Sequence, residues 1–304
     1  MGSTTSGTNY SEPEYAKSQD RAKVPFYTVD IASRLVPETQ DLLERYSNVP
    51  RDQQVEHVHS IRDKAWEVRA YPCIGLGVWL TPQLRRLPAY ESIMARVKNG
   101  ASLMDVGTFI GHDLRRLAYD GAPSEKLIGV DIVNFSELSY ELFRDRDRFH
   151  GRFIEADFLS SSPELLALKG QIDIVVVSQL LHQWDWENQV KALETLITFT
   201  KPAPGSSIVG NQIGNAVAQS VDVKGLPSVT IWRHNQESLA KMFEVAGKAT
   251  GSQWETQAWL RSGSEMGWDD KDVTWMEPGE DETWRLELDV TPPQGHIDEE
   301  NLHL

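Results

Sequence analysis

The sequence predicts an α/β protein with a Rossmann-like, mostly parallel sheet, antiparallel closing strands and an N-terminal helical cap. Two observations support this prediction. After Asn99, short apolar runs alternate with segments of helical periodicity, which is typical of parallel strands joined by crossover helices. Before Asn99, apolar residues are spaced mostly as in helices, and no sustained two-residue alternation indicates a sheet.

The N-terminal part is expected to divide in two. Residues 1–22 are polar and rich in Ser, Thr and Gly, which predicts a disordered tail. Residues 23–98 contain Pro72, Pro82 and Pro88, so their helices should be short. We interpret this second segment as a cap that closes over an acceptor molecule and could contact a second subunit.

The main domain is expected over residues 99–291. Its predicted parallel strands are 102–106, 127–130, 153–156, 172–177 and 208–210, and its predicted helices are 114–119, 137–143, 163–168, 190–199 and 238–245. Two later runs, 254–260 and 284–290, suit an antiparallel pair at the sheet edge. Residues 292–304 begin with two prolines, contain an acidic stretch at 298–300 and predict a second disordered tail.

Composition restricts the class of partner. The formal net charge of −15 argues against a nucleic acid or an anionic membrane surface, although charge alone leaves a tRNA or protein acceptor open. The single Cys73 excludes an intrachain disulfide and suits a reducing compartment. No apolar run approaches the ~18 residues of a membrane span, and the N-terminus lacks a signal-peptide core. We expect a cytoplasmic protein that acts on a small hydrophobic molecule.

A nucleotide-type loop is predicted between the first strand and the first helix of the main domain, with the sequence DVGTFIG at 105–111. Gly107 and Gly111 allow the backbone to approach a ligand closely, with Thr108 between them. The helix that follows offers unpaired N–H groups and a partial positive charge. Asp105 can face a cationic group. Taken alone, the loop would also fit a plain strand–turn–helix.

Two further acids stand at strand ends. Asp131 ends the second strand, 26 residues after Asp105 (131 − 105 = 26), near the usual place of an acid that binds ribose hydroxyls. Asp157 follows the third strand, where a carboxylate can accept from an adenine amino group. Any one of these acids could be a helix N-cap, but three at successive strand ends share the ligand-binding edge. We therefore predict an S-adenosyl-L-methionine site, with Asp105 facing the ammonium group. The neighbouring residues expected to complete it are Ile132, Ala156 and Ser178.

The order of these motifs is similar to that of class I S-adenosylmethionine-dependent methyltransferases, and it continues through IVVVSQLLHQW at 174–184. More closely, the chain resembles the fungal methyltransferases of meroterpenoid and other secondary-metabolite pathways. The resemblance spans roughly residues 26–290 and includes EVRAYPCIG at 67–75 and WMEPG at 275–279. It implies methyl esterification of a carboxyl group on a prenylated aromatic intermediate, and a homodimer. Two departures are Phe109, in place of the middle glycine, and the acidic stretch 280–282.

His182 and Trp184, after the fourth strand, are candidates for the acceptor site. His182 could deprotonate a hydroxyl, orient a carboxylate, or bond its own loop. A carboxylate is already ionised at neutral pH, whereas a phenol with a pKa near ~10 would benefit from a base.

The cap supplies further candidates. Arg69 could pair with an acceptor carboxylate, or with Glu67 or another acid of the protein. Tyr71 and Trp79 could form an apolar wall. Beyond the fifth strand, Arg233 offers a second cation beside a tryptophan.

We predict an S-adenosylmethionine-dependent O-methyltransferase that esterifies a hydrophobic carboxylic acid. The alternatives are O-methylation of a phenol or alcohol with His182 as base, and an inactive, cofactor-binding regulatory partner. A dinucleotide oxidoreductase is disfavoured because Phe109 breaks the G-x-G-x-x-G pattern. No Cys or His cluster has the spacing of metal ligands, so no metal is expected.

Overall fold

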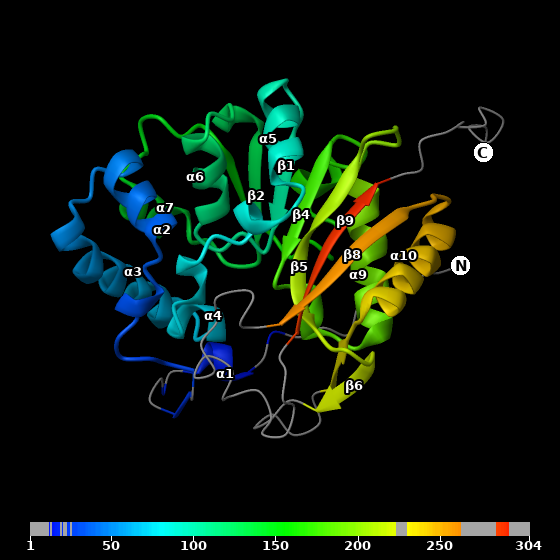
Figure 1. The fold of residues 1–304 in the computed structure, drawn as a ribbon, viewed down its shortest axis with the longest axis horizontal. Helices are drawn as coiled ribbons and strands as arrows, with labels where there is room; N and C mark the ends of the chain where they lie inside the picture. Colours follow the sequence, from blue (N-terminus) through cyan, green and yellow to red (C-terminus); the bar gives the residue numbers. More distant parts are fainter. Residues whose placement is uncertain are drawn as a thin grey trace.

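A seven-stranded sheet forms the centre of the computed structural model, which describes residues 12, 14–18, 20, 23–24, 26–222, 230–262 and 284–291 (Figure 1). The strand order is β3-β2-β1-β4-β5-β9-β8. The first five strands are parallel, and β9 and β8 complete the sheet in antiparallel pairs. The strands are β1 (Leu103–Val106), β2 (Leu127–Asp131), β3 (Arg152–Glu155), β4 (Ile174–Ser178), β5 (Ser207–Gly214), β8 (Glu255–Ser262) and β9 (Trp284–Thr291). The predicted fold class is confirmed.

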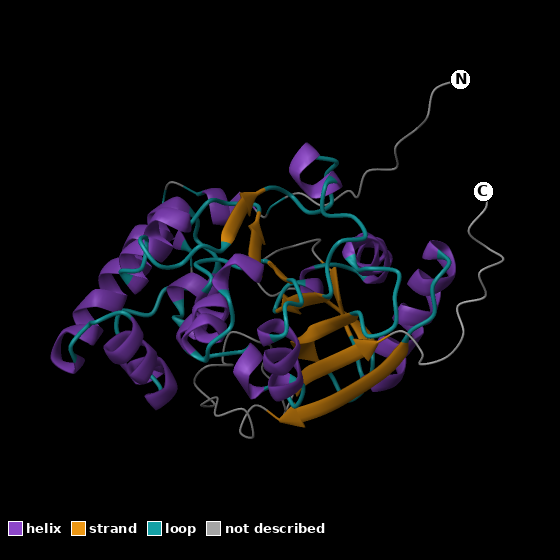
Figure 2. Ribbon diagram, turned by 90° about the horizontal axis from the view of Figure 1, so that it is seen from above, coloured by secondary structure: helices purple, strands orange, loops and turns teal. Residues whose placement is uncertain are grey.

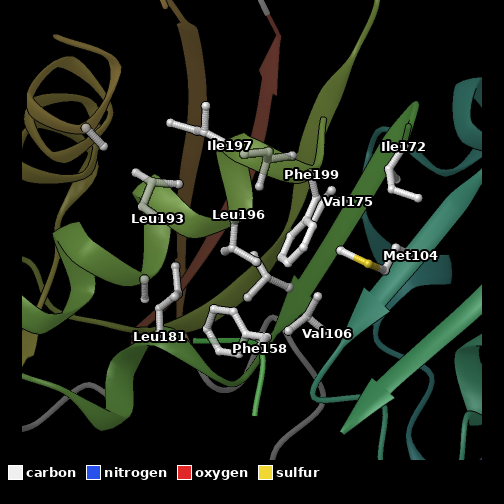
Figure 3. Packing of buried hydrophobic residues seen from close by; sticks show 14 of the residues in the cluster. Met104, Val106, Phe158, Ile172, Val175, Leu181, Leu193, Leu196, Ile197 and Phe199 are labelled. Atoms are coloured by element: carbon white, nitrogen blue, oxygen red, sulfur yellow. The ribbon is translucent and has the colours of Figure 1, made fainter. Parts of the chain in front are cut away.

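Helices cover both faces of the sheet (Figure 2), so the central strands β1 and β5 are buried along their whole length. On one face α9 and α10 pack, and Figure 3 shows Leu196 and Phe199 of α9 against Val175 of β4. On the other face α5 and α6 pack. The helices are α5 (Tyr90–Lys98), α6 (His112–Tyr119), η7 (Ser124–Lys126), α7 (Ser136–Phe143), α8 (Pro163–Leu166), η8 (Leu181–Gln183), α9 (Trp186–Phe199) and α10 (Gln236–Thr250).

A small antiparallel sheet of β6 (Gln219–Asp222) and β7 (Thr230–Arg233) was not expected from the sequence. The polar strand β6 is largely exposed and lacks the apolar alternation by which strands are predicted. The end of β7 is tied to the main domain, because Trp232 N–H donates to the Trp184 carbonyl at 2.9 Å. This contact brings β7 beside the segment that follows β4.

The part of the chain before α5 is helical, and the N-terminal helical cap predicted with the fold class is confirmed. Its helices are α1 (Glu14–Lys17), η2 (Ala32–Arg34), α2 (Pro37–Asp41), η3 (Leu42–Tyr46), η4 (Arg51–Gln53), α3 (Gln54–Val68), α4 (Pro72–Gly75), η5 (Val78–Leu80) and η6 (Leu84–Arg86). Figure 1 shows α1 and α4 at the same end of the sheet as β6. The roles of the cap as acceptor lid and dimer contact stay predictions.

The N-terminal segment differs from the expected tail over its described residues. Ala16 of α1 is fully buried, and its carbonyl accepts the Ala70 N–H at 2.9 Å. Tyr15 packs edge-on to Phe26, with ring centroids 5.4 Å apart. Burial of these apolar groups holds the segment against the cap. The rest of the expected tails, the motif at 275–279 and the acidic stretch 280–282 lie outside the described residues.

One group of buried side chains joins the cap to the main domain, and we call it the cap cluster. Its buried members are Val24, Phe26, Ile31, Leu35, Leu42, Leu43, Val49, Val58, Ile61, Ala65, Trp66, Ala70, Ile74, Trp79, Leu80, Phe109, Ile110, Val133, Phe135, Leu142 and Phe143. Four of these residues, at 109, 110, 133 and 135, belong to the loops after β1 and β2. The cap therefore packs directly on the loops predicted to hold the cofactor.

Candidate active site

The loop between β1 and α6 is held in a conformation that only a few residue types adopt readily. Gly107 and Gly111 have positive φ values of 79° and 64°, in the left-handed region that favours glycine. The N–H groups of Gly107 and Thr108 both donate to the Val130 carbonyl, at 2.8 and 3.2 Å, which ties the loop to β2. The two predicted glycines are thus required by the turn itself.

Phe109 also lies in the left-handed region, with φ of 50°, which costs about 1–2 kcal/mol for a residue other than glycine. Its ring is nine-tenths buried and contacts Phe135 and Trp79 at centroid distances of 4.8 and 5.8 Å. Aromatic packing of this kind offsets the backbone strain. Phe109, the residue that departs from the class pattern, therefore connects the cap to the loop.

Asp105 is a buried acid at the end of β1. One carboxylate oxygen accepts from Thr108 Oγ1 at 2.8 Å. Burial, together with the negative charges of Asp113 and Asp131, raises the pKa of Asp105 to about 7. A buried carboxyl with acids as neighbours would be stabilised in its ionised form by a bound cation, which fits an ammonium group.

Asp131, at the end of β2, organises both adjoining loops. Its two carboxylate oxygens accept from the backbone N–H groups of Phe109 at 2.8 Å and Val133 at 3.1 Å. Desolvation raises its pKa to about 6, and these N–H groups oppose the increase. Each oxygen has a second lone pair, so the carboxylate can still accept from ribose hydroxyls. The next residue, Ile132, is 40% exposed and offers an apolar surface beside them.

The third and fourth strands end at the same edge, because β1 to β4 are parallel and in register. Ala156 donates its N–H to the Asp131 carbonyl at 2.8 Å. Asp157 uses one oxygen to accept the Leu159 N–H at 2.9 Å within a turn, and the next helix, α8, is capped by Ser162 in place of Asp157. Ser178 at the end of β4 buries an Oγ that has no hydrogen-bond partner among the described residues.

A second group of polar residues surrounds η8, which contacts both β5 and β7. His182 in η8 is half-buried, and its Nδ1 has no hydrogen-bond partner in the described part of the chain. Burial, together with the positive charge of Arg233, lowers the pKa of His182 to about 4. The fold thus brings together His182 and the buried Arg233, which lie 51 residues apart (233 − 182 = 51).

The structure places the other acceptor candidates differently. Arg69 Nε donates to Glu12 Oε1 at 2.8 Å, and the Tyr71 hydroxyl donates to the same oxygen, so both residues engage an acid of the protein. Trp79 lies in the cap cluster against Phe109. Trp184 packs on Phe158 in the main core, 6.0 Å between ring centroids, because η8 turns its large side chain inward. These contacts tie the four residues into the fold, and their roles toward an acceptor stay predictions.

Sequence reasoning missed one buried polar residue of this region. Gln212 of β5 is 2% exposed, and neither amide atom has a partner within the described residues. It stands in no motif, so no sequence signal could have found it. His234, which belongs to the same run 232–234 as the predicted Arg233, is fully buried, with Nδ1 2.8 Å from Ser238 Oγ.

Across the described ranges, no cluster of three or more His, Cys, Asp or Glu side chains could hold a metal ion. The helices in the same ranges are too short or too polar for any of them to span a bilayer.

Comparison with known proteins relates this chain to fungal methyltransferases. Residues 26–80 match the family model of the meroterpenoid methyltransferase N-terminal domain. The chain is similar to the O-methyltransferase atr3 of Stereocaulon alpinum, at 36% identity over 267 residues, 86% of this chain and 77% of that protein. It is also similar to the asnovolin E/chermesin D methyltransferase nvfJ of Aspergillus novofumigatus, at 33% identity over 225 residues, 73% of this chain and 81% of that protein.

A more distant likeness is to a solved 1,6-didemethyltoxoflavin-N1-methyltransferase of Burkholderia thailandensis, with a TM-score of 0.48 and 14% identity over 82% of this chain and 90% of that chain. Because the identity and the TM-score are this low, the solved structure adds nothing to what the strand order and the sequence relatives establish.

Proposed function

Because the chain belongs to the fungal S-adenosylmethionine-dependent methyltransferases of meroterpenoid and other secondary metabolism, we propose that it esterifies a hydrophobic, prenylated aromatic carboxylic acid. S-adenosylmethionine, when bound, would supply a methyl group on a sulfonium sulfur: a carboxylate oxygen would bond to the methyl carbon in line while the carbon–sulfur bond breaks, and its electron pair would stay on the departing sulfur. An ionised carboxylate gives up no proton in this reaction, so positioning and exclusion of water would supply most of the rate.

The residues at the ends of β1 to β4 fit this cofactor. Asp105 would face the methionyl ammonium, and Asp131 would accept from the ribose hydroxyls. Ile132 and the second oxygen of Asp157 would face the adenine. Ser178 would lie nearest the acceptor half, by which we mean the residues around β5, η8 and β7. The burial of Asp105 supports this assignment, because a bound cation would stabilise the ionised form of a buried carboxyl.

The observation that supports a carboxylate acceptor is the position of the Arg233 charge close enough to His182 to lower its pKa. A histidine whose pKa is lowered to about 4 stays neutral at physiological pH and is a weak base toward a phenol with a pKa near ~10. A neutral imidazole can instead donate one N–H to a carboxylate. The Arg233 guanidinium attracts an anionic acceptor.

The test compares a prenylated hydroxybenzoic acid with its methyl ester, in which only the phenol remains available. We expect methylation of the acid alone, located at the carboxyl group by fragmentation mass spectrometry. His182→Ala should lower kcat by less than about tenfold while the cofactor Kd is unchanged. A loss of about 100-fold or more, or methylation of the phenol, would support a hydroxyl acceptor with His182 as base.

Two further parts of the proposal rest on the resemblance. Binding of S-adenosylmethionine without turnover of any acid or phenol would indicate an inactive regulatory partner. We also propose a homodimer, with the cap as the contact, and light scattering of the purified protein should give twice the mass of one chain. A monomeric mass would contradict the dimer and leave the esterification unaffected.

A further inference from the structure

Gln212 buries a whole amide group at the edge of the acceptor half. Its side chain is 2% exposed, and neither Nε2 nor Oε1 has a hydrogen-bond partner in the described part of the chain. An amide left unpaired in this way destabilises the folded state. Native proteins pair nearly all such groups, so an unpaired one indicates a missing partner.

The neighbouring residue Asn211 differs from Gln212, because its amide oxygen has a partner, whereas only its Nδ2 has none among the described residues. Its Oδ1 accepts from Gln179 Nε2, and its carbonyl accepts the Gln179 N–H, both at 2.7 Å. Asn211 also pairs with Ser178 in the sheet, so the two lie on the same face. Because side chains alternate along a strand, Gln212 lies on the opposite face, one position nearer the carboxyl edge.

Other unpartnered polar atoms gather around this position. Gly214, two residues after Gln212, bridges to His234, and the Asn215 N–H donates to the His234 carbonyl at 2.9 Å. This brings the end of β7 beside the end of β5, while η8 contacts both strands. His182 Nδ1, Trp232 Nε1 and His234 Nε2 are buried here, and none of these atoms has a hydrogen-bond partner among the described residues.

We propose that Gln212 is an acceptor-binding residue, whose amide Nε2 donates a hydrogen bond to a carboxyl oxygen of the acid to be methylated. The proposal rests on the proposed esterification and names a further residue for it. Oε1 is then available to accept from a hydroxyl group of the same acceptor or from a water molecule. Gln212 thereby sets specificity for a polar, oxygen-bearing end of an otherwise hydrophobic molecule.

The experiment compares two buried glutamines. Gln189 of α9 is fully buried, and its Nε2 donates to the carbonyls of Trp184 and Trp232 at 2.9 and 2.8 Å. Gln189→Met removes these two bonds and should lower the midpoint of thermal unfolding. Gln212→Met replaces an unpaired amide with an apolar chain of similar length, so the midpoint should stay or rise.

The readouts for Gln212→Met are the KM for a prenylated hydroxybenzoic acid that the wild type methylates, and the Kd for S-adenosylmethionine. We expect KM to rise about tenfold or more and Kd to change less than about twofold, as for the loss of one hydrogen bond to a charged group. Gln212→Glu should raise KM further, because a carboxylate repels the acid.

An unchanged KM in both variants would overturn the proposal. So would an increase in KM accompanied by a loss of stability as large as that of Gln189→Met, because Gln212 would then be structural. The two proposals fail in different ways. If the wild type binds S-adenosylmethionine but methylates no acid in the panel, the proposed esterification is wrong. If the wild type methylates the acid and Gln212→Met does so with the same KM, only the role of Gln212 is wrong.

Discussion

The two halves of the ligand edge differ in how completely the protein satisfies its own polar groups. In the cofactor half, at the ends of β1 and β2, Asp131 accepts two backbone N–H groups and Asp105 accepts the Thr108 hydroxyl. In the acceptor half, around β5, η8 and β7, the buried polar atoms of Gln212 and His182 Nδ1 have no partner within the described residues. The cofactor half is therefore organised before its ligand arrives, whereas the acceptor half needs its ligand to complete its hydrogen bonds.

The largest expected effect tests whether the cap organises the cofactor half. Phe109→Ala removes the ring that joins the loop to Trp79 and Phe135, and we expect the free energy of unfolding to fall by about 4 kcal/mol. Phe109→Gly removes the same ring but relieves the left-handed backbone, so its loss should be smaller by about 1 kcal/mol. Equilibrium denaturation in urea measures both.

A loss below about 1 kcal/mol for Phe109→Ala would show that the cap and the loop are not coupled through this ring. If the alanine variant were as stable as the glycine variant, the positive φ of residue 109 would carry no strain.

The second effect tests whether Asp131 holds the loop ready for the cofactor. Asn at this position keeps one acceptor oxygen and turns an amide N–H₂ toward a backbone N–H, so one of the two loop bonds is lost. We expect Asp131→Asn to raise the Kd for S-adenosylmethionine about 100-fold, since a charge-assisted bond contributes up to about 3 kcal/mol. Isothermal calorimetry measures the change.

Asp173 is the matched control, because it also accepts a backbone N–H, from Ser102 at 2.8 Å, but at the opposite end of the sheet. Asp173→Asn should leave the cofactor Kd unchanged. A Kd within about threefold of the wild type for Asp131→Asn would remove Asp131 from the site and weaken the contrast between the halves.

The same contrast explains what could be predicted from the sequence. The fold class follows from apolar periodicity, and Asp105 and Asp131 follow from their places at strand ends, because backbone geometry near a strand end is a local property. Phe109 was noticed as a departure, but its role depends on Trp79, which comes from a distant part of the chain. The chemistry of the cofactor half is thus encoded over short distances in the sequence.

The acceptor half is assembled from distant segments, and its residues have no local signal. Gln212 stands in a buried strand like any other residue, and its significance comes from the absence of a partner among the described residues, which only tertiary structure reveals. In the cap, the partner of Arg69 and Tyr71 is Glu12, 57 and 59 residues earlier, in a segment expected to be a tail. Long-range pairing of this kind cannot be read from composition or spacing.

The smallest effect concerns pH and again separates the two halves. Burial raises the pKa of Asp105 from 3.8 to about 7, so the folded state binds the extra proton between these values, and the free energy of unfolding should fall as the pH rises through this range. A bound ammonium favours the ionised carboxylate. Between pH 6 and 7 the ionised fraction rises about fivefold, and the affinity for S-adenosylmethionine should rise by the same factor.

The range from pH 6 to 7 lies below the pKa of an α-amino group, which is about 8, so the ammonium group of the ligand stays charged. Calorimetry in buffers of different ionisation enthalpy should detect close to one proton released at pH 6.

Asp105→Asn should abolish most of the pH dependence, and what remains would come from Asp131, whose pKa is about 6. His182, which titrates near 4 in the acceptor half, should contribute nothing in this range. An affinity that stays flat from pH 6 to 7 in the wild type would mean that Asp105 does not face the ammonium group, and that the cofactor half owes its binding to Asp131 and the loop alone.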